Sequence, residues 1–288
     1  MNNLLLGCHV SMKKPDYLLG SLHEALSYGA NCFMIYNGAP QNIVRAPIDT
    51  LKITEFQHVC KQNNIDLANV IVHAPYIINL ATKDANKHKF AINILMDEIK
   101  RTNAIGCKYL VVHPGNAIGI TKQEAICNIA SVINHVHKHN ENVILCLETM
   151  SGKGSEVGIS FDELAQIIKL VDNKHLIGVC LDTCHINDAG YKVNKFDELL
   201  NEFDKIIGLK YLKVIHLNDS KNLCGSRSDR HENIGYGTIG FNNLLSVVYH
   251  HKLLHLPKIL ETPYFSDKPP YKYEIEMIRQ KKFIKFKD

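Results

Sequence analysis

The sequence predicts an α/β fold, a TIM (β/α)8 barrel with its active site at the C-terminal rim of the strands, and three observations support this prediction. Eight short apolar segments recur along the 288 residues, and amphipathic segments fill the gaps between them. No Pro- or Ser-rich linker divides the chain, so residues 1–288 are expected to form one domain, with a short basic tail from about residue 263. Eight strand-then-helix units most simply close into a barrel, although an open, doubly wound sheet is the alternative.

The eight apolar segments are nearly continuous in hydrophobicity, which is typical of parallel strands buried on both faces. The first is rich in leucine, the second (CFMIY) is mixed, and most of the later ones are dominated by valine, isoleucine and leucine. In chain order, the predicted strands cover residues 4–10, 32–36, 70–73, 109–113, 143–148, 177–182, 212–216 and 258–261.

The segments between these strands carry apolar residues at three- and four-residue spacing, the pattern of an amphipathic helix. The predicted helices cover residues 18–28, 54–63, 85–103, 122–139, 161–171, 195–207, 241–250 and 273–282. Ser160 followed by Glu163 predicts a capping box at the start of one of them. Gly29 and Gly106 lie where helix ends favour a left-handed residue.

The composition is that of an ordinary globular protein, with 45% hydrophobic residues and a formal net charge of +4. It excludes a disordered, collagen-like or coiled-coil chain. The first residues lack the pattern of a secretory signal, and no apolar run approaches the roughly 18 residues needed to span a bilayer. Nine cysteines, an odd number, fit reduced thiols. We therefore expect a cytoplasmic or nucleoid-associated protein that does not bind membranes.

Polar side chains end most of the predicted strands. Six of the eight finish on a residue able to bind a metal ion: His73, His113, Glu148, Asp182, His216 and Glu261. A barrel delivers these strand ends to one rim, so we expect the side chains to converge. His185 follows three residues after Asp182 and is expected to join them. Asp229 and His231 are two residues apart, so an extended segment would point both the same way.

Any one of these side chains is more often a hydrogen-bonded polar group than a ligand. Together, nine imidazole and carboxylate groups on one rim would be costly to bury without cations. Histidine and carboxylate ligands suit zinc, with Mn²⁺ or Fe²⁺ possible at one site. Nine ligands are more than one ion can use, so the sequence predicts two or three ions. His9 is expected to lie behind the ligands without binding metal itself. The remaining histidines are not expected to bind metal.

Several motifs resemble the endonuclease IV family of abasic-site DNA repair enzymes. They are residues 72–80 (VHAPYIINL), 178–185 (GVCLDTCH), 216–221 (HLNDSK) and 225–237 (GSRSDRHENIGYG). The resemblance runs from residues 7–11 (GCHVS) to residues 259–262 (ILET), which is nearly the whole chain. Long motifs in the same order are far more specific than any short pattern.

The resemblance implies an enzyme that uses three zinc ions and metal-bound hydroxide to hydrolyse the phosphodiester 5′ to an abasic site in double-stranded DNA. The products would be a 3′-hydroxyl and a 5′-deoxyribose phosphate, and trimming of blocked 3′ ends is expected as well. By matching motif, His73 and His113 would hold one ion, and Glu148 would bridge it to a second. Asp182, His216 and Glu261 would complete the second site, and His185, Asp229 and His231 the third. Glu148 and Glu261 are the expected catalytic residues.

The resemblance also implies rim loops that enter the DNA and flip the abasic nucleotide out of the stack. Tyr76 and Ile77 match one such element. The loop at 36–42 departs from the family pattern, with Asn37 at its start and Gln41 where an arginine is expected; Arg45 is a possible substitute. Phosphate contacts are expected from Lys221, Arg227 and Arg230, which lie among the matched motifs. The family suggests a monomer.

Two other functions are compatible with parts of the pattern. A xylose isomerase-like sugar isomerase or epimerase would use Glu148, Asp182, His216 and Glu261, but it would not need the five further ligands. A DNA-damage-binding or metal-binding scaffold without activity is the second alternative, although no ligand is missing to favour it. The surplus of ligands favours phosphodiester cleavage.

Overall fold

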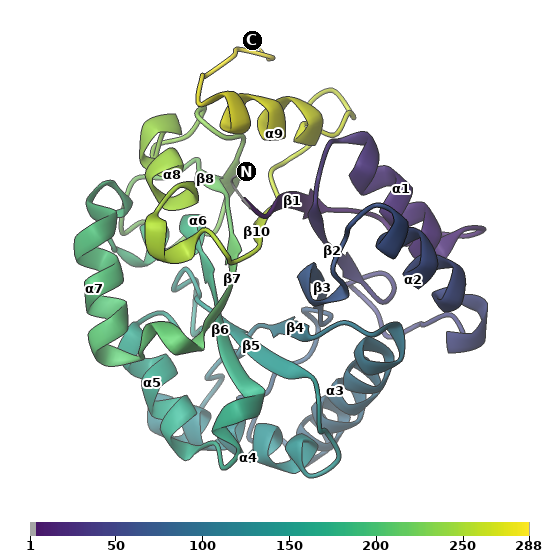
Figure 1. Cartoon of the computed structure of the whole chain (residues 1–288). Helices are drawn as coiled ribbons and strands as arrows, with labels where there is room; N and C mark the ends of the chain where they lie inside the picture. The colour runs from purple at the N-terminus through teal and green to yellow at the C-terminus, as the bar shows by residue number, and fades with distance from the viewer. Residues whose placement is uncertain (1–3, 288) are drawn as a thin grey trace.

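The computed structural model describes residues 4–287 and contains a closed barrel of eight parallel strands (Figure 1). The strands are β1 (Leu6–His9), β2 (Cys32–Tyr36), β3 (Val70–His73), β4 (Tyr109–Val112), β5 (Ile144–Glu148), β6 (Ile177–Asp182), β7 (Leu212–His216) and β10 (Lys258–Leu260). The barrel closes because β1 pairs with both β2 and β10, for example Gly7 with Cys32 and Leu6 with Lys258. This closure confirms the predicted TIM barrel and excludes the open sheet.

All eight predicted helices are present and surround the strands as an outer ring (Figure 1). They are α1 (Tyr17–Ser27), α2 (Ile53–Gln62), α3 (Ala85–Ile105), α4 (Lys122–His137), α5 (Phe161–Leu170), α7 (Phe196–Ile206), α8 (Phe241–Val248) and α9 (Tyr271–Gln280). Short 3₁₀ turns are η1 (Ile48–Thr50), η2 (Leu67–Asn69), η3 (Lys174–Leu176), η4 (Val193–Lys195), η5 (Leu209–Tyr211) and η6 (His251–Leu253). Gly106 ends α3 with a φ of 89°, as predicted, and Gly29 follows α1 with a φ of 77°.

Two elements at the C-terminal rim were not predicted. A short helix, α6 (Thr183–Ala189), follows β6 directly, and an antiparallel pair joins β8 (Asp219–Ser220) to β9 (His231–Glu232). Neither is long enough to show a period in hydrophobicity, so the sequence pattern gave no signal for them. Both lie where candidate ligands follow the strands, and both therefore shape the site.

The predicted capping box at Ser160 is only half formed. The Ser160 side chain accepts the backbone N–H of Glu163, as expected for an N-cap. The Glu163 carboxylate accepts the N–H of Gly158 at 2.7 Å rather than returning to Ser160. A reciprocal box occurs instead at α4, between Thr121 and Glu124.

The core has two layers, one inside the barrel and one between the strands and helices. The inner layer contains three cysteines among its apolar side chains: Cys32, Met34, Ile71, Val111, Ile144, Cys146, Cys180, Val214 and Ile259. All nine cysteines are free thiols, in agreement with the predicted reduced state. The inner layer fills the barrel below the rim, so ligands can approach only from the loops above the strand ends.

The chain after residue 263 includes α9, which buries Tyr271, Ile275 and Met277 against the barrel and lies near α1 and α8 (Figure 1). Aromatic side chains continue this packing beyond the helix, where Phe286 stacks on Tyr273 at a centroid distance of 5.5 Å. None of the helices in the described range is long and apolar enough to cross a membrane.

Candidate metal centre

The nine predicted ligands meet at the C-terminal rim of the barrel. The register of the strands explains this, because β6 and β7 place Asp182 beside His216, while β2 and β3 place Tyr36 beside His73. Ligand atoms within 4.8 Å of one another form overlapping groups: His73, His113 and Glu148; Glu148, Asp182, His216 and Glu261; Asp182, His185 and His231; and Cys184, Asp229 and His231. The strand-end prediction therefore describes one continuous cluster.

Glu148 lies at the centre of the cluster and is 1% exposed. Its Oε2 lies 3.0 Å from Nε2 of His73 and 3.1 Å from Nε2 of His113. Its Oε1 lies 2.9 Å from Nδ1 of His216 and 3.5 Å from Nδ1 of His185. One carboxylate thus faces imidazoles from three different groups, as a bridging ligand would.

The charges of the cluster stabilise one another. Burial alone would raise the pKa of the Glu148 carboxyl, but the positive charges of His216 and His113 hold that pKa well below its usual value. Glu261 behaves in the same way: burial opposes ionisation, and His216 lowers the pKa of the carboxyl despite it. For His216, burial opposes the charged form, yet the negative groups facing it raise its pKa well above the usual value. The rim is therefore built to hold carboxylates in their ionised form beside positive charge.

Asn218 orients two of the carboxylates and was not recognised in the sequence as a functional residue. Its Nδ2 donates to Oδ2 of Asp182 at 2.7 Å and to Oε2 of Glu261 at 3.5 Å. Its Oδ1 also accepts the backbone N–H of Glu261 at 2.8 Å. It is fully buried and follows His216 by two residues. Its place inside the 216–221 motif was the available signal.

The third group forms through the unpredicted elements. Nε2 of His185, from α6, lies 3.0 Å from Oδ1 of Asp229, and Nε2 of His231, from β9, lies 3.6 Å from the same oxygen. Asp229 has a left-handed φ of 57°, so the expected extended backbone was wrong at this residue, although its side chain does converge with that of His231 as expected. Its backbone N–H donates to Oδ2 of Asp188 at 2.9 Å, which fixes this turn.

The side chains present fit metal ions. Nε2 of His231 is buried without a hydrogen-bond partner, although it lies 3.8 Å from Oδ2 of Asp182. Such an orphaned imidazole nitrogen among carboxylates is explained by a cation. Cys184 also lies within reach of Asp229 and His231, which the sequence did not lead us to expect. Burial raises the pKa of the Cys184 thiol, which favours the neutral form that binds metals poorly.

The predicted DNA contacts divide into two sets. Exposed side chains at the rim are Gln41, Tyr76, Ile77, Lys221, Arg227 and Arg230. Asn37 and Arg45 differ from the prediction, because both side chains are turned inward onto Glu98 of α3. Asn37 is 1% exposed, and the Arg45 side chain is 5% exposed. A direct DNA contact by either one is therefore not supported in this conformation.

A closed parallel barrel with histidines and carboxylates clustered at its C-terminal rim defines a TIM-barrel protein of the metal-dependent class. Residues 22–281 match the family described as "Xylose isomerase-like TIM barrel". The chain is 51% identical over 287 residues to "Probable endonuclease 4" of Bacillus subtilis, covering 97% of this chain and 96% of that one. It is 50% identical over 283 residues to the protein of the same name from Acholeplasma laidlawii, covering 97% and 96%. The chain belongs to the endonuclease IV family.

Solved structures agree with this assignment. Endonuclease IV from Thermus thermophilus is similar, with a TM-score of 0.83 and 27% identity, covering 96% of this chain and 97% of that one. A D-tagatose 3-epimerase-like protein has a TM-score of 0.71 at 19% identity, covering 96% of both chains, and shares the fold. The resemblance inferred from the motifs is thus confirmed.

Proposed function

We propose that the protein is a DNA repair endonuclease that hydrolyses the phosphodiester 5′ to abasic sites in double-stranded DNA. The products are a 3′-hydroxyl and a 5′-deoxyribose phosphate, and trimming of blocked 3′ ends belongs to the same proposal. The observation that carries it is the extension of one four-residue group, Glu148 with Asp182, His216 and Glu261, into a cluster with further ligands on both sides. Membership of the endonuclease IV family supports it.

The cluster would hold three zinc ions, with Mn²⁺ or Fe²⁺ as an alternative at one position. The first would be held by His73, His113 and Glu148; the second by Glu148, Asp182, His216 and Glu261; and the third by His185, Asp229 and His231. When bound, such ions neutralise charge on phosphoryl oxygens and lower the pKa of water towards about 7. No protonated side chain is then needed to assist the leaving group.

The exposure of the ligands indicates the side from which DNA approaches. The side chains of Glu148 and Asp182 are 1% and 0% exposed, whereas that of Glu261 is 16% exposed. Among the other ligands, His113 and Asp229 are also open to solvent. Glu261 is therefore the carboxylate of the second group that can meet an attacking water, and we assign it the role of orienting that water.

The rim supplies groups for the rest of the substrate. Lys221, Arg227 and Arg230 are exposed among the ligands and would bind phosphates, which carry most of the affinity for DNA. Tyr76 and Ile77, 51% and 40% exposed, would contact bases beside the lesion. A nucleotide without a base has lost its stacking and pairing, so it is the cheapest to flip into a pocket.

A sugar isomerase or epimerase is the second candidate, and the fold shared with a D-tagatose 3-epimerase-like protein favours it. Such an enzyme would need only Glu148, Asp182, His216 and Glu261. This function leaves unexplained why His73 and His185, 1% and 3% exposed, are buried against Glu148, one of those four residues. The larger cluster therefore favours the nuclease.

The proposal is tested by incubating the purified protein with a duplex that carries one tetrahydrofuran analogue of an abasic site, without added magnesium. We expect a single nick 5′ to the analogue, with a 3′-hydroxyl on the shorter product. The same duplex without the analogue is the control and should stay intact. Absence of nicking at the analogue, by protein of full metal content, would reject the nuclease.

A further inference from the structure

The loop that follows β2, residues 37–47, is organised largely by side chains. Its backbone contributes a hydrogen bond from the N–H of Asn42 to the carbonyl oxygen of Ala39, at 3.2 Å. Nη1 of Arg45 donates to the carbonyl oxygens of Asn42, Val44 and Ala39, at 3.0, 3.1 and 3.5 Å. The loop therefore folds around the guanidinium of Arg45.

Glu98 of α3 anchors both ends of this loop. Its Oε1 accepts Nε–H of Arg45 and its Oε2 accepts Nδ2–H of Asn37, each at 2.7 Å. Arg101, one turn further along α3, donates to the carbonyl oxygen of Ala46 at 2.7 Å. A buried ion pair says little about stability, because apolar side chains of similar volume often stabilise a fold as well. The contacts of Glu98 instead specify one conformation of the loop.

The loop closes tightly on its anchor and exposes an apolar tip. A Cβ atom on Gly38 would lie 2.6 Å from the carbonyl oxygen of Val44 and 2.8 Å from Nη1 of Arg45, so the close approach requires glycine. On the outer side, Val44 is 74% exposed and Ile43 is 44% exposed. Exposed apolar side chains held on an ordered loop have no partner within the described chain and suit contact with another molecule.

The position of the loop indicates which molecule this is. Asn37 follows Tyr36, whose ring lies 4.9 Å from the ring of His73 in the ligand cluster. The tip therefore stands at the same rim as the cluster and the exposed cations Lys221 and Arg230. A rim that carries both exposed cations and exposed apolar side chains fits DNA, because its phosphates and base faces require both.

We propose that Glu98 is a positioning residue for DNA recognition, which acts through Arg45 and Asn37 to present Ile43 and Val44 to the bases beside the scissile phosphodiester. This inference rests on the proposed nuclease function and deepens it. Inserting an apolar side chain into a duplex requires unstacking of a base step. A loop that is already ordered does not lose further conformational freedom when it binds DNA. The free energy of its contacts is therefore not reduced by the cost of ordering the loop.

The test compares Glu98→Gln and Val44→Ser with the unmodified enzyme on two substrates, duplex DNA and a single strand, each with one tetrahydrofuran analogue. Both variants should raise KM for the duplex roughly tenfold, as expected for one good contact, and leave kcat within about twofold. KM for the single strand should change little, because no stacked step has to be opened. Val44→Leu should restore KM for the duplex. Leu170→Ser, at an exposed apolar residue of α5, is the matched control and should behave as the unmodified enzyme.

The outcomes separate this inference from the function on which it rests. Failure of the unmodified enzyme to nick the duplex rejects the nuclease itself. Normal nicking with an unchanged KM in Val44→Ser, or a normal KM in Glu98→Gln, overturns the positioning role alone. An equal rise in KM for both substrates also overturns it. If Glu98→Gln does not fold, Asn37→Ser replaces it, because this change removes only the neutral contact to Glu98. It should raise KM for the duplex by less than about tenfold, and an unchanged KM would overturn the positioning role.

Discussion

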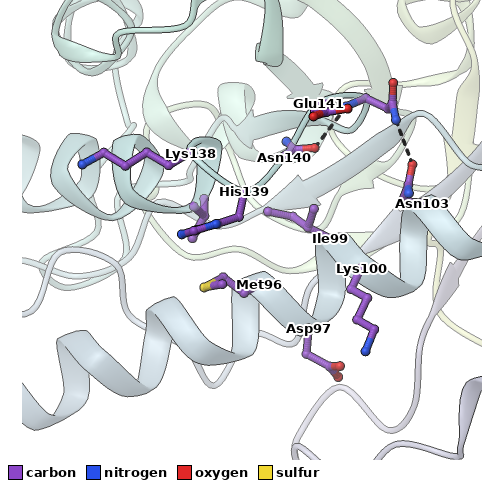
Figure 2. A pocket seen from close by; sticks show the side chains of 11 residues that line it. Met96, Asp97, Ile99, Lys100, Asn103, Lys138, His139, Asn140 and Glu141 are labelled. Atoms are coloured by element: carbon purple, nitrogen blue, oxygen red, sulfur yellow. Dashed lines mark hydrogen bonds between the residues drawn. The ribbon is translucent and has the colours of Figure 1, made fainter.

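The metal-ligand cluster and a cavity between α3 and α4 lie at opposite ends of the barrel, and they differ in their chemistry. The cavity has a volume of about 760 Å³ and is lined by polar and charged side chains, including Asp97, Lys100, His139 and Glu141 (Figure 2). Within the described residues, none of these belongs to a group of potential metal ligands. At the rim, by contrast, imidazoles and carboxylates from several strands face one another.

The asparagine side chains of the cavity are satisfied locally. Oδ1 of Asn140 accepts the N–H of Val143 at 3.0 Å, and Nδ2 of Asn142 donates to Oδ1 of Asn103 at 3.2 Å. These contacts end α4 and lead the chain into β5. Convergence of titratable side chains, rather than open volume, is therefore the reason for placing the candidate functional site at the rim.

Removal of metal should have the largest effect on nicking activity, and it should distinguish the ligand cluster from the α3–α4 cavity most clearly. Dialysis against a chelator should lower nicking by roughly 10³-fold or more, because the positive charge that activates water and binds phosphate is lost. The thermal midpoint should also fall, since the buried carboxylates lose their cations. Activity is measured by nicking and stability by calorimetry. Recovery with Zn²⁺ is expected, and full activity of metal-free protein would refute a metal role.

Glu261→Gln should have the next largest effect. The amide is nearly isosteric but cannot take up a proton, so turnover should fall by about 10² to 10⁴-fold while DNA binding persists. Single-turnover nicking and a binding titration measure the two properties separately. The matched control is Glu141→Gln in the α3–α4 cavity, which should keep normal turnover. Near-normal turnover in Glu261→Gln would remove this residue from the mechanism.

A buried carboxyl outside the cluster should respond to pH in the opposite sense to Glu148. Burial raises the pKa of Glu274 in α9 to about 7, despite hydrogen bonds from Thr262, Ile234 and Asn233. The folded state then binds the proton on Glu274 more tightly than the unfolded chain does. The contribution of this carboxyl to the free energy of unfolding is therefore complete below about pH 4.5 and is lost as pH rises through 7. The loss amounts to about 3 kcal/mol.

The measurement is the free energy of unfolding against pH for the protein and for Glu274→Gln. The difference between the two curves isolates this carboxyl, and Glu276→Gln, at an exposed residue of the same helix, is the control. A difference that is flat between pH 4.5 and 8 would show that Glu274 ionises normally in the fold.

The smallest effect is expected in the cavity between α3 and α4. Lys100→Ala removes an exposed side chain that has no convergent partner, so turnover should be unchanged and stability should shift by no more than about 0.5 kcal/mol. Nicking and chemical denaturation measure this. A large loss of nicking would mean that the cavity belongs to the functional surface, and the contrast between the two regions would no longer hold.

The strand ends could be predicted because apolar runs stop on His113, Glu148 and Asp182, and a parallel barrel sends all such ends to one rim. The inward turn of Arg45 could not, because it depends on Glu98, 53 residues away in the sequence. The left-handed turn at Asp229 was equally hidden, since it follows from the β8–β9 pair and Asp188. Local pattern thus predicted which candidate ligands converge, whereas tertiary contacts decide how the loops around them are held.

The central proposal is that these nine ligands hold three metal ions, and metal content measures it most directly. Folded protein, purified without chelator and desalted, should contain about three equivalents of metal per chain by elemental analysis, zinc being the main species. Substitution of Asp229 by Asn should reduce this by about one equivalent. A content of one equivalent in the unmodified protein would contradict the proposal and favour a sugar isomerase.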